Sequence, residues 1–250
     1  MAEILRITGL VKRFGGVAAT DGLDLDVRAG DVHAVIGPNG AGKSTLIHQV
    51  SGALVPDAGT VVFEERDVTG LSMHERVAAG IARSFQVTNV FARLAVLDNV
   101  ALAVQARTRS CFSFWRPAIG DAAAFAEAMR ILDRVGLVAR ADAAAGALSH
   151  GEQRRLEMAL ALATQARLLL LDEPMAGMDT AESAALLSLL RELRAHCTLL
   201  LVEHDMDAVF QLADRISVLV YGRVIATGTP DAIRANEEVR RAYLGDTLPA

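Results

Sequence analysis

A glycine-rich stretch near the start of the chain has the residue types and spacing of a loop that binds phosphate groups. Residues 37–44 read GPNGAGKS and satisfy the pattern G-x-x-x-x-G-K-[ST], in which glycines let successive backbone N–H groups turn toward phosphate oxygens. The positive end of a following helix adds to this attraction. Lys43 is expected to hold the β- and γ-phosphates, and the Ser44 hydroxyl to ligate Mg²⁺, which predicts ATP with Mg²⁺ as the ligand. The predicted contact residues are Gly37, Pro38, Asn39, Gly40, Ala41, Gly42, Lys43, Ser44 and Thr45.

Two adjacent carboxylates later in the chain are placed where they could complete such a site. Asp172 and Glu173 follow the apolar run Leu168 to Leu171, the pattern of a parallel strand that is buried on both faces. Ligands of open α/β sheets bind at the carboxyl ends of such strands. We expect Asp172 to hold Mg²⁺, through water or the Ser44 shell, and Glu173 to orient and deprotonate the attacking water. Alternatively, the two carboxylates could only cap the next turn, but the presence of the phosphate loop makes this interpretation less favoured.

The elements that must position the loop can be read around it. Val32 to Ile36 is a short apolar run typical of a buried strand, and Lys43 to Ala53 has the character of a helix. This order of strand, loop and helix disfavours a plain glycine turn. The alternation of apolar and polar residues from Leu23 to Val27 predicts a half-exposed strand, and a small antiparallel sheet should begin the fold.

The second half of the chain predicts a helical insert followed by a parallel α/β core. Residues 93–165 are rich in alanine and helical in character, and they include an expected helix from Asp121 to Val135. The buried-strand pattern of Thr198 to Val202 follows a predicted helix from Ala181 to His196. The chain then continues with a predicted hairpin, formed by Ile216 to Val220 and Val224 to Ala226. Closing helices are predicted after it, with Thr229 as the N-cap and Pro230 in the first turn.

The composition limits the classes of function. The chain has 250 residues, 52% of them hydrophobic, which is enough to bury a sizeable core. Its formal net charge of −5 disfavours nucleic acid as a partner. We found no apolar run that could cross a bilayer and no leader pattern, and we expect a soluble chain. Cys111 and Cys197 have no neighbours at metal-ligand spacing and are predicted to be packing residues in a reducing compartment. No motif surrounds His33, His48, His74 or His196, which are predicted to be surface or packing residues.

The stretch Leu148-Ser149-His150-Gly151-Glu152 resembles the signature motif of the ATP-binding cassette (ABC) family, and it precedes Asp172 and Glu173 in the way the family requires. The resemblance covers nearly the whole chain. It implies an α/β fold, a P-loop NTPase of the ABC type, with a mostly parallel core sheet, an N-terminal antiparallel β subdomain and a helical insert. One nucleotide-binding domain is expected over residues 1–250, with its core at about 1–87 and 163–250 and its helical subdomain at about 88–162.

The resemblance implies further site residues. Phe14 stands where the family stacks an aromatic ring on adenine. Gln86 stands where the family's glutamine reaches Mg²⁺ and hinges the helical insert, although a lone glutamine would mean little. His204 matches the histidine that contacts the γ-phosphate and helps to hold the water and Glu173 in place. The implied catalytic set is therefore Lys43, Glu173 and His204.

The signature motif also implies a second subunit. In the family, the residues matching Ser149 and Gly151 bind the γ-phosphate held by the other subunit, so a single chain carries two half-sites. Asp179 occupies the loop that crosses the same interface. His150 and Glu152 depart from the commonest glycine and glutamine. We expect the negative charge of Glu152 to tune ATP-driven closure rather than abolish it.

Three stretches, namely 80–86, 111–117 and 239–245, resemble the LivG type of branched-chain amino acid importer ATPases. The resemblance implies ATP hydrolysis coupled to amino-acid import at the cytoplasmic face of the bacterial inner membrane. The expected partners are transmembrane permease subunits, a second ATP-binding subunit that is identical or related, and indirectly a substrate-binding protein. Relatives that extract lipopolysaccharide share some of these features, and a soluble ABC protein in translation or DNA repair is a further alternative. The aromatic residues Phe112, Phe114 and Trp115 would contact the membrane partner or form a small satellite core.

Overall fold

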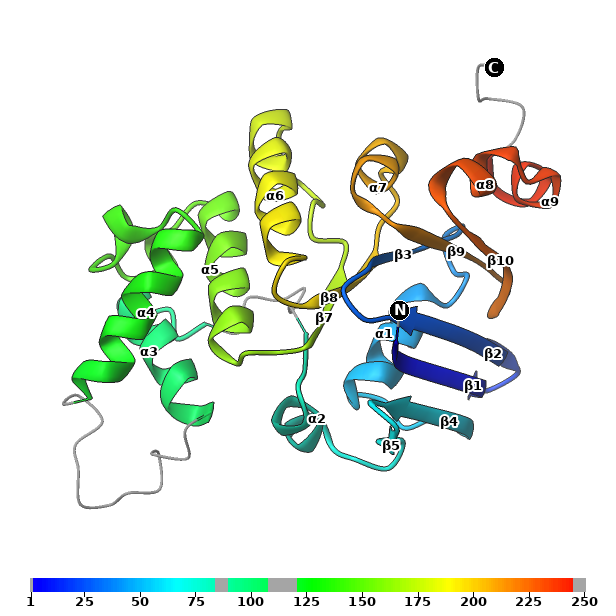
Figure 1. The fold of residues 1–250 in the computed structure, drawn as a ribbon, viewed down its shortest axis with the longest axis horizontal. Coiled ribbons are helices and arrows are strands. Elements are labelled where there is room, and N and C mark those ends of the chain that lie inside the picture. The colour runs from blue at the N-terminus through cyan, green and yellow to red at the C-terminus, as the bar shows by residue number, and fades with distance from the viewer. Residues whose placement is uncertain (1, 84–89, 108–120, 245–250) are drawn as a thin grey trace.

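The structure is a computed structural model of the chain, and it describes residues 2–83, 90–107 and 121–244 (Figure 1). Gln86, Cys111 and the aromatic residues Phe112, Phe114 and Trp115 lie outside the described residues, so their predicted roles stay predictions.

A six-stranded sheet forms the centre of the fold. Its strand order is β10-β9-β3-β8-β7-β6, and all neighbours run parallel except the edge pair of β10 and β9. The strands β3, β7 and β8 are buried at every residue, as expected for strands covered on both faces. A mostly parallel core sheet is therefore confirmed. The strands are β3 (Val32–Ile36), β6 (Ile81–Arg83), β7 (Leu168–Asp172), β8 (Thr198–Val202), β9 (Arg215–Val220) and β10 (Arg223–Gly228).

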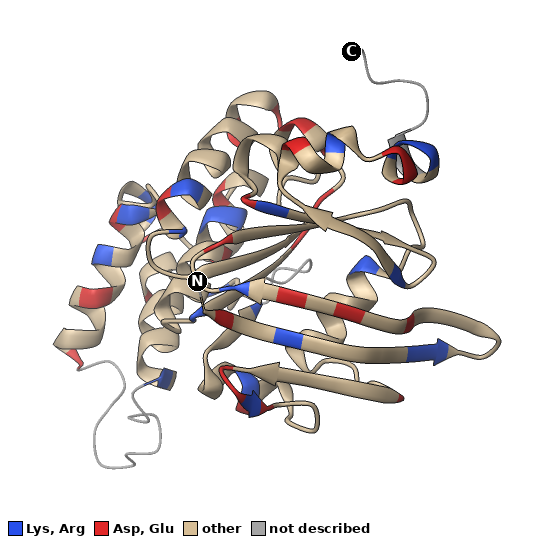
Figure 2. Ribbon diagram, turned by 45° about the vertical axis from the view of Figure 1, so that its right-hand side comes forward, with Lys and Arg blue, Asp and Glu red and all other residues tan. Residues whose placement is uncertain are grey.

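A second, antiparallel sheet comes from the N-terminal part of the chain, as predicted. Its order is β2-β1-β4-β5, with β1 (Glu3–Phe14), β2 (Val17–Arg28), β4 (Ala58–Phe63) and β5 (Arg66–Asp67). Figure 2 shows β1 and β2 as a long hairpin with basic residues on β1 and acidic residues on β2. Arg13 on β1 lies 3.4 Å from the carboxylate of Asp21 on β2. Such cross-strand pairs add modestly to the pairing of the two strands.

Helix α1 (Lys43–Ser51) packs its apolar side between the two sheets. Leu46, Ile47 and Val50 are fully buried in a core cluster that contains residues of β1, β2, β3, β7 and β8. The helix ends two residues earlier than expected because Gly52 adopts a left-handed conformation (φ 78°) and terminates it.

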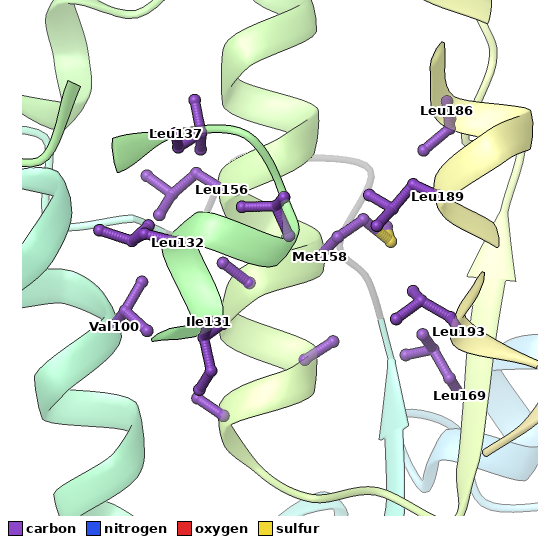
Figure 3. Close-up of a cluster of buried hydrophobic side chains, with 14 of the residues drawn as sticks. Val100, Ile131, Leu132, Leu137, Leu156, Met158, Leu169, Leu186, Leu189 and Leu193 are labelled. Carbon is purple, nitrogen blue, oxygen red and sulfur yellow. The ribbon is translucent and has the colours of Figure 1, made fainter. Parts of the chain in front are cut away.

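The remaining long helices form a layer beside β7 and β8. They are α3 (Val96–Arg107), α4 (Ala122–Arg134), α5 (His150–Ala163) and α6 (Thr180–Leu193). Figure 3 shows Val100, Leu132, Leu156 and Leu193 converging from these helices on one apolar cluster. Asp121 caps α4 at the predicted start, whereas α6 ends three residues before His196, where the chain turns into β8. The domain boundaries at residues 88 and 162 stay a prediction.

Short helices complete the described chain. The helix α2 (Met73–Ala79) precedes β6, α7 (Met206–Leu212) follows β8, and α8 (Pro230–Ala235) and α9 (Glu237–Val239) follow β10. Thr229 caps α8 and Pro230 occupies its first turn, as predicted. In the part of the chain that the structure describes, no helix combines the length and the apolar character that crossing a bilayer requires.

Candidate functional site

The glycine-rich loop joins β3 to α1, and two of its glycines have no room for a side chain. A Cβ atom at Gly37 would collide with the carbonyl oxygen of Leu219, and one at Gly42 would collide with that of Ala19. Gly42 also has a φ of 104°, which residues with side chains rarely adopt. The loop is therefore pressed between β2 and β9, with its N–H groups at the start of a helix. This is the arrangement that binds phosphate in other proteins.

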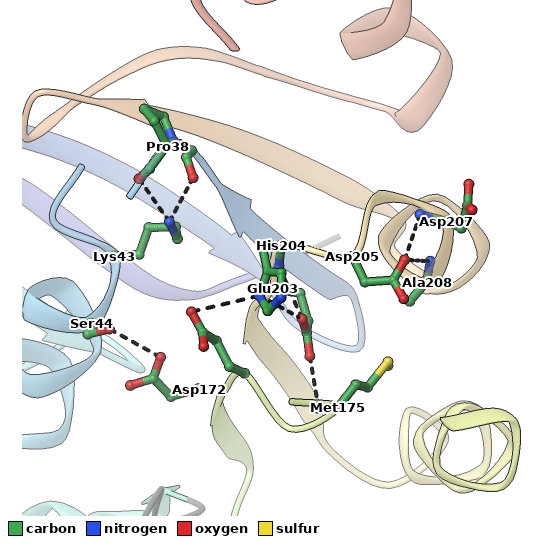
Figure 4. A network of polar contacts seen from close by, with 12 residues as sticks. Pro38, Lys43, Ser44, Asp172, Met175, Glu203, His204, Asp205, Asp207 and Ala208 are labelled. Carbon is green, nitrogen blue, oxygen red and sulfur yellow. Dashed lines mark hydrogen bonds and ion pairs between the residues drawn. The ribbon is translucent and has the colours of Figure 1, made fainter. Parts of the chain in front are cut away.

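The side chain of Lys43 lies against the phosphate loop, to which its ammonium group is hydrogen-bonded (Figure 4). Its Nζ donates hydrogen bonds to the backbone oxygens of Gly37 at 2.7 Å and Pro38 at 3.0 Å. Only 6% of the residue is exposed, and burial lowers the pKa of its ammonium group, while Glu173 and Asp172 oppose that shift. The charge is held at the loop, where an arriving phosphate would meet it.

Asp172 ends β7 directly beside the start of α1. Its carboxylate oxygen Oδ1 accepts a long hydrogen bond of 3.5 Å from the Ser44 hydroxyl, and its Oδ2 lies 3.1 Å from Nη2 of Arg83. Burial raises the pKa of the Asp172 carboxyl, and the positive charge of Arg83 is the main opposing influence. Nothing in the local sequence links Arg83 to Asp172, because 89 positions separate the two residues.

The oxygens of Asp172 and Ser44 suit a hard cation such as Mg²⁺. Among the described residues, no group of three or more His, Cys, Asp or Glu residues could enclose a metal ion. Magnesium is commonly held by one or two protein oxygens together with substrate phosphates and water, and the two groups at this strand end fit that pattern.

Glu173 has an unusual backbone conformation. Its φ of 48° is rare for a residue with a side chain. Its N–H donates a hydrogen bond of 2.9 Å to the oxygen of Val202, which ties the turn after β7 to the end of β8. Such strained residues often occur where a side chain must be aimed at a ligand. The carboxylate is partly exposed, and its negative charge opposes the lowering of the Lys43 pKa by burial.

His204 follows β8 and faces Glu173. Its Nδ1 lies 3.9 Å from Oε1 of Glu173 and 3.8 Å from Oε2 of the neighbouring Glu203. Glu203 is only 1% exposed, and it accepts hydrogen bonds from the backbone N–H groups of Met175 (2.9 Å) and His204 (3.1 Å). It joins the turns that follow β7 and β8, as Figure 4 shows. This role of Glu203 was not predicted from the sequence, because its partner Met175 lies 28 positions away.

The signature stretch begins helix α5. Ser149 is the N-cap, and its hydroxyl accepts a hydrogen bond of 3.3 Å from the N–H of Glu152. The Glu152 carboxylate accepts one of 2.8 Å from the N–H of Ser149 and lies 3.0 Å from Arg140. The hydrogen bond from the Ser149 backbone is the main cause that lowers the pKa of Glu152. The unusual acid is thus paired with a cation in the same chain.

Asp179 has a similar place at the start of α6, where its side chain and that of Glu182 form a capping box. The two helix starts touch, because a Cβ atom at Gly151 would collide with the Glu182 carboxylate. Gly151 and Asp179 therefore both lie against Glu182, and with Ser149, two residues before Gly151 at the cap of α5, they form a second group of predicted site residues. Their action across a subunit interface stays a prediction.

Phe14 ends strand β1 and is 53% exposed, with the ammonium of Lys12 at 6.0 Å from its ring centre. The hairpin that carries it also supplies the Ala19 carbonyl that presses on Gly42. An exposed ring on the hairpin next to the phosphate loop is compatible with stacking on a base. His33 and Cys197 are packing residues, as predicted: His33 is fully buried, and burial raises the pKa of Cys197 to about 11.

A cavity of about 310 Å³ lies between α2 and β6 on one side and α3 and α5 on the other. Its lining is mostly apolar and includes Val77, Phe91 and Leu102, and Arg83 and Glu157 are the charged residues in the part of the lining that the structure describes. Since Arg83 also contacts Asp172, one side chain belongs to both the cavity wall and the strand end at the phosphate loop.

Known proteins resemble the chain in sequence and in fold. Residues 20–176 match the family model described as ABC transporter, and residues 223–247 match the model described as branched-chain amino acid ATP-binding cassette transporter. The high-affinity branched-chain amino acid transport ATP-binding protein LivG of Salmonella typhimurium is 39% identical, over 97% of this chain and 98% of its own. The corresponding protein BraF of Pseudomonas aeruginosa is 37% identical, over 97% of this chain and 98% of its own.

The fold agrees with these relatives. The solved ADP conformation of MJ1267, an ATP-binding cassette of an ABC transporter, superposes with a TM-score of 0.85 at 32% identity, over 98% of this chain and 100% of the other. The nucleotide-free form of an ATP-binding cassette from an ABC transporter gives a TM-score of 0.84 at the same identity and coverage. The chain therefore belongs to the ABC transporter family, and its activity is that of the family's ATPase cassettes.

Proposed function

We propose that the chain is the ATP-hydrolysing subunit of an importer of branched-chain amino acids. The observation that carries the proposal is the match of residues 223–247 to the branched-chain cassette model, at the end of a chain whose LivG relatives align over nearly its full length. A general ABC cassette would need only the phosphate loop, the strand-end carboxylates and the signature helix, so the C-terminal match favours this particular class.

ATP would bind at the loop between β3 and α1. Its phosphates would accept hydrogen bonds from the loop N–H groups and from Lys43, and its base would stack on Phe14. Ser44 and Asp172 would hold Mg²⁺, which neutralises charge on the β- and γ-phosphate oxygens when bound. Lys43 already lies in the loop and would exchange its two backbone acceptors for phosphate oxygens without a large movement.

Glu173 would act as the base toward the attacking water. It directly follows β7 with a left-handed backbone, its Oε1 lies 3.9 Å from Nδ1 of His204, and its negative charge acts on the ammonium group of Lys43. His204 would contact the γ-phosphate with its ring and keep Glu173 in place. Glu203 supports both by joining the two turns through hydrogen bonds to backbone N–H groups. A base held in position before the reaction lowers the barrier more than a mobile one.

A second ATP-binding subunit would complete the site. The N-terminus of α5, with Ser149 and Gly151, would point its partial positive charge at a γ-phosphate held by the other subunit, and Asp179 would lie at the same interface. The pairing of Glu152 with Arg140 at 3.0 Å supports this, because it offsets a negative charge that would otherwise oppose the phosphate. Gln86, which is not among the described residues, would be a further ligand of the metal.

The cavity between α2 and α3 would receive a cytoplasmic segment of a transmembrane permease subunit. Its apolar lining suits the apolar side of a short helix, and Arg83 and Glu157 could pair with polar groups of that helix. The complex would lie at the cytoplasmic face of the bacterial inner membrane and would receive amino acids from a substrate-binding protein on the other side.

Uptake by the host cell tests the proposal. Deleting the gene should abolish uptake of labelled leucine, isoleucine and valine at low concentration, and the parent chain should restore it. Lys43→Ala should not restore it, since the charge that offsets the phosphates is gone, whereas Arg66→Ala, an exposed change on β5, should. An immunoblot confirms equal amounts of each chain. Unchanged uptake of these three amino acids, with loss of another class of substrate, contradicts the proposed cargo while leaving the ATPase intact.

A further inference from the structure

Arg83 occupies a position that connects β6 to the end of β7. It is the last residue of β6, which runs parallel to β7 with Arg83 opposite Leu170. Because the strands run in the same direction, the side chain of Arg83 can extend beyond the end of β6 and reach Asp172, two residues further along β7. Its Nη2 lies 3.1 Å from Oδ2 of Asp172, and only 9% of the Arg83 side chain is exposed.

The two oxygens of Asp172 have different partners. Oδ2 accepts from Arg83, whereas Oδ1 faces the hydroxyl of Ser44 at 3.5 Å. The Asp172 side chain is completely buried, so water does not compete for either oxygen. A hydrogen bond between two charged groups is shorter and stronger than a neutral one, and it fixes the rotation of the carboxylate. The weaker contact, at Ser44, is the one left for a ligand to replace.

The pair is costly to maintain, which argues against a simple stabilising role. Removing two charges from water costs several kcal/mol for each ion, and buried ion pairs often add little to stability. Within the described residues, no acceptor is found for Nε of Arg83, which is also buried. A leucine or methionine could fill this space without that cost. The charge is therefore better explained by what it does to Asp172.

We propose that Arg83 is a positioning residue for ATP hydrolysis: it holds Oδ2 of Asp172 and so presents Oδ1, beside Ser44, to the metal of the bound nucleotide. The inference rests on the Mg²⁺ site of the proposed function. Groups that orient a metal ligand without touching the metal typically contribute 10- to 100-fold to metal affinity.

Removing Arg83 would change the affinity for Mg²⁺ in two opposite ways, through charge repulsion and through the orientation of Asp172. The positive charge of Arg83 repels a nearby cation, so its removal could by itself tighten Mg²⁺ binding. However, removal also leaves a fully buried carboxylate oxygen without its strong partner, and the carboxylate is then free to rotate. Because the hydrogen bond from Ser44 to Oδ1 is long, at 3.5 Å, it would hold the carboxylate weakly, and we expect loss of orientation to dominate.

Mg²⁺ titration of nucleotide binding tests the inference without relying on turnover. The full chain binds a fluorescent, non-hydrolysable ATP analogue, first in EDTA and then with increasing Mg²⁺. Arg83→Met should bind the analogue in EDTA as the parent does, but should need on the order of 10-fold more Mg²⁺ for the metal-dependent increase. Arg83→Lys, which keeps a charge and a donor, should give an intermediate midpoint. Arg194→Met, which removes a partly exposed arginine 2.9 Å from Asp214, is the matched control and should match the parent.

The outcomes separate the inference from the function on which it rests. If Mg²⁺ does not change nucleotide binding by the parent, the proposed metal site is wrong. If the parent responds but Arg83→Met has an unchanged or lower Mg²⁺ midpoint, Arg83 does not position Asp172 and the inference is overturned. Should Arg83→Met fail to fold, as judged by thermal unfolding, Arg83→Lys decides alone, because a parent-like midpoint with this weaker donor also overturns the inference.

Discussion

The change Arg76→Met should destabilise the fold more than a typical surface substitution. Arg76 lies in α2, is only 1% exposed, and donates hydrogen bonds to four backbone oxygens, those of Gln49 (2.7 Å), Val50 (2.8 Å), Thr69 (2.8 Å) and Leu71 (3.2 Å). Two of these oxygens belong to the last turn of α1, where a positive charge is also favoured by the helix dipole.

The size of the effect follows from two opposing contributions. Burial lowers the pKa of Arg76, which shows that desolvation opposes its charge, and a methionine would remove this cost. Methionine would, however, remove this donor from four backbone acceptors, of which the Gln49 oxygen keeps a hydrogen bond of 3.3 Å from the N–H of Gly52. A hydrogen bond to a charged group contributes about 1.5–3 kcal/mol, and an orphaned buried group costs about 1–3 kcal/mol. We therefore expect a net loss of about 3–5 kcal/mol, because several charged hydrogen bonds are lost while one desolvation cost is removed.

Urea unfolding of the full chain, followed by circular dichroism, measures this loss. The midpoint should fall strongly while the slope of the transition stays the same, because the native contacts outside α2 are retained. Arg66→Met is the matched control, since Arg66 is exposed on β5 and its replacement should change the free energy of unfolding by less than about 0.5 kcal/mol. A loss below about 1 kcal/mol for Arg76→Met would refute the reasoning, because desolvation would then balance the four hydrogen bonds.

Three further predictions concern the site and the core. Glu173→Gln should keep nucleotide affinity and lower phosphate release by about 10²- to 10⁴-fold, and turnover like that of the parent would remove Glu173 from the role of base. Ser149→Arg should leave the monomer folded but prevent ATP-dependent dimers in sedimentation experiments, whereas normal dimers and turnover would exclude a role across the interface. Burial lowers the pKa of His33 from its ordinary 6.5 to about 4, so between these pH values the ring should be neutral in the fold and become protonated on unfolding. Its contribution to the stability of the fold is therefore present above pH 6.5 and lost as the pH falls toward 4. The parent should lose roughly 3 kcal/mol of stability over that range relative to His33→Gln, and equal pH profiles in urea unfolding would contradict this.

Local patterns in the sequence predicted much of the fold. The buried strands Val32–Ile36 and Thr198–Val202 have the predicted bounds. A strand covered on both faces is marked in the sequence by a short run of apolar residues between turn signals, so its bounds can be predicted locally. Helix α2 was missed because it is short and has little apolar periodicity. Its start was readable, since Ser72 and Glu75 form a capping box at the spacing that marks a helix N-terminus.

The site was predictable where its chemistry depends on local spacing and not where it depends on topology. The phosphate loop is one continuous stretch, so its residue types alone predict its geometry. The contacts of Asp172 with Arg83, and of Glu203 with Met175, join segments that only the sheet brings together. Glu152 shows the same limit. Its charge could be read from the sequence, but its pairing with Arg140 depends on how α5 packs beside the preceding turn.

The structure also indicates how the phosphate loop and the cavity could influence each other. Helix α1 carries Lys43 at its first residue, and Arg76 of α2 binds the carbonyl oxygens near its last residue. The wall of the cavity includes Met73 and Val77 of α2 and Arg83 of β6. A movement of the side formed by α2 and β6 would therefore act on α1 through Arg76 and on Asp172 through Arg83, each over a single side chain. Coupling of this kind requires no relay through the core. The two arginines can be tested separately, because we expect replacement of Arg76 to change stability and replacement of Arg83 to change metal binding.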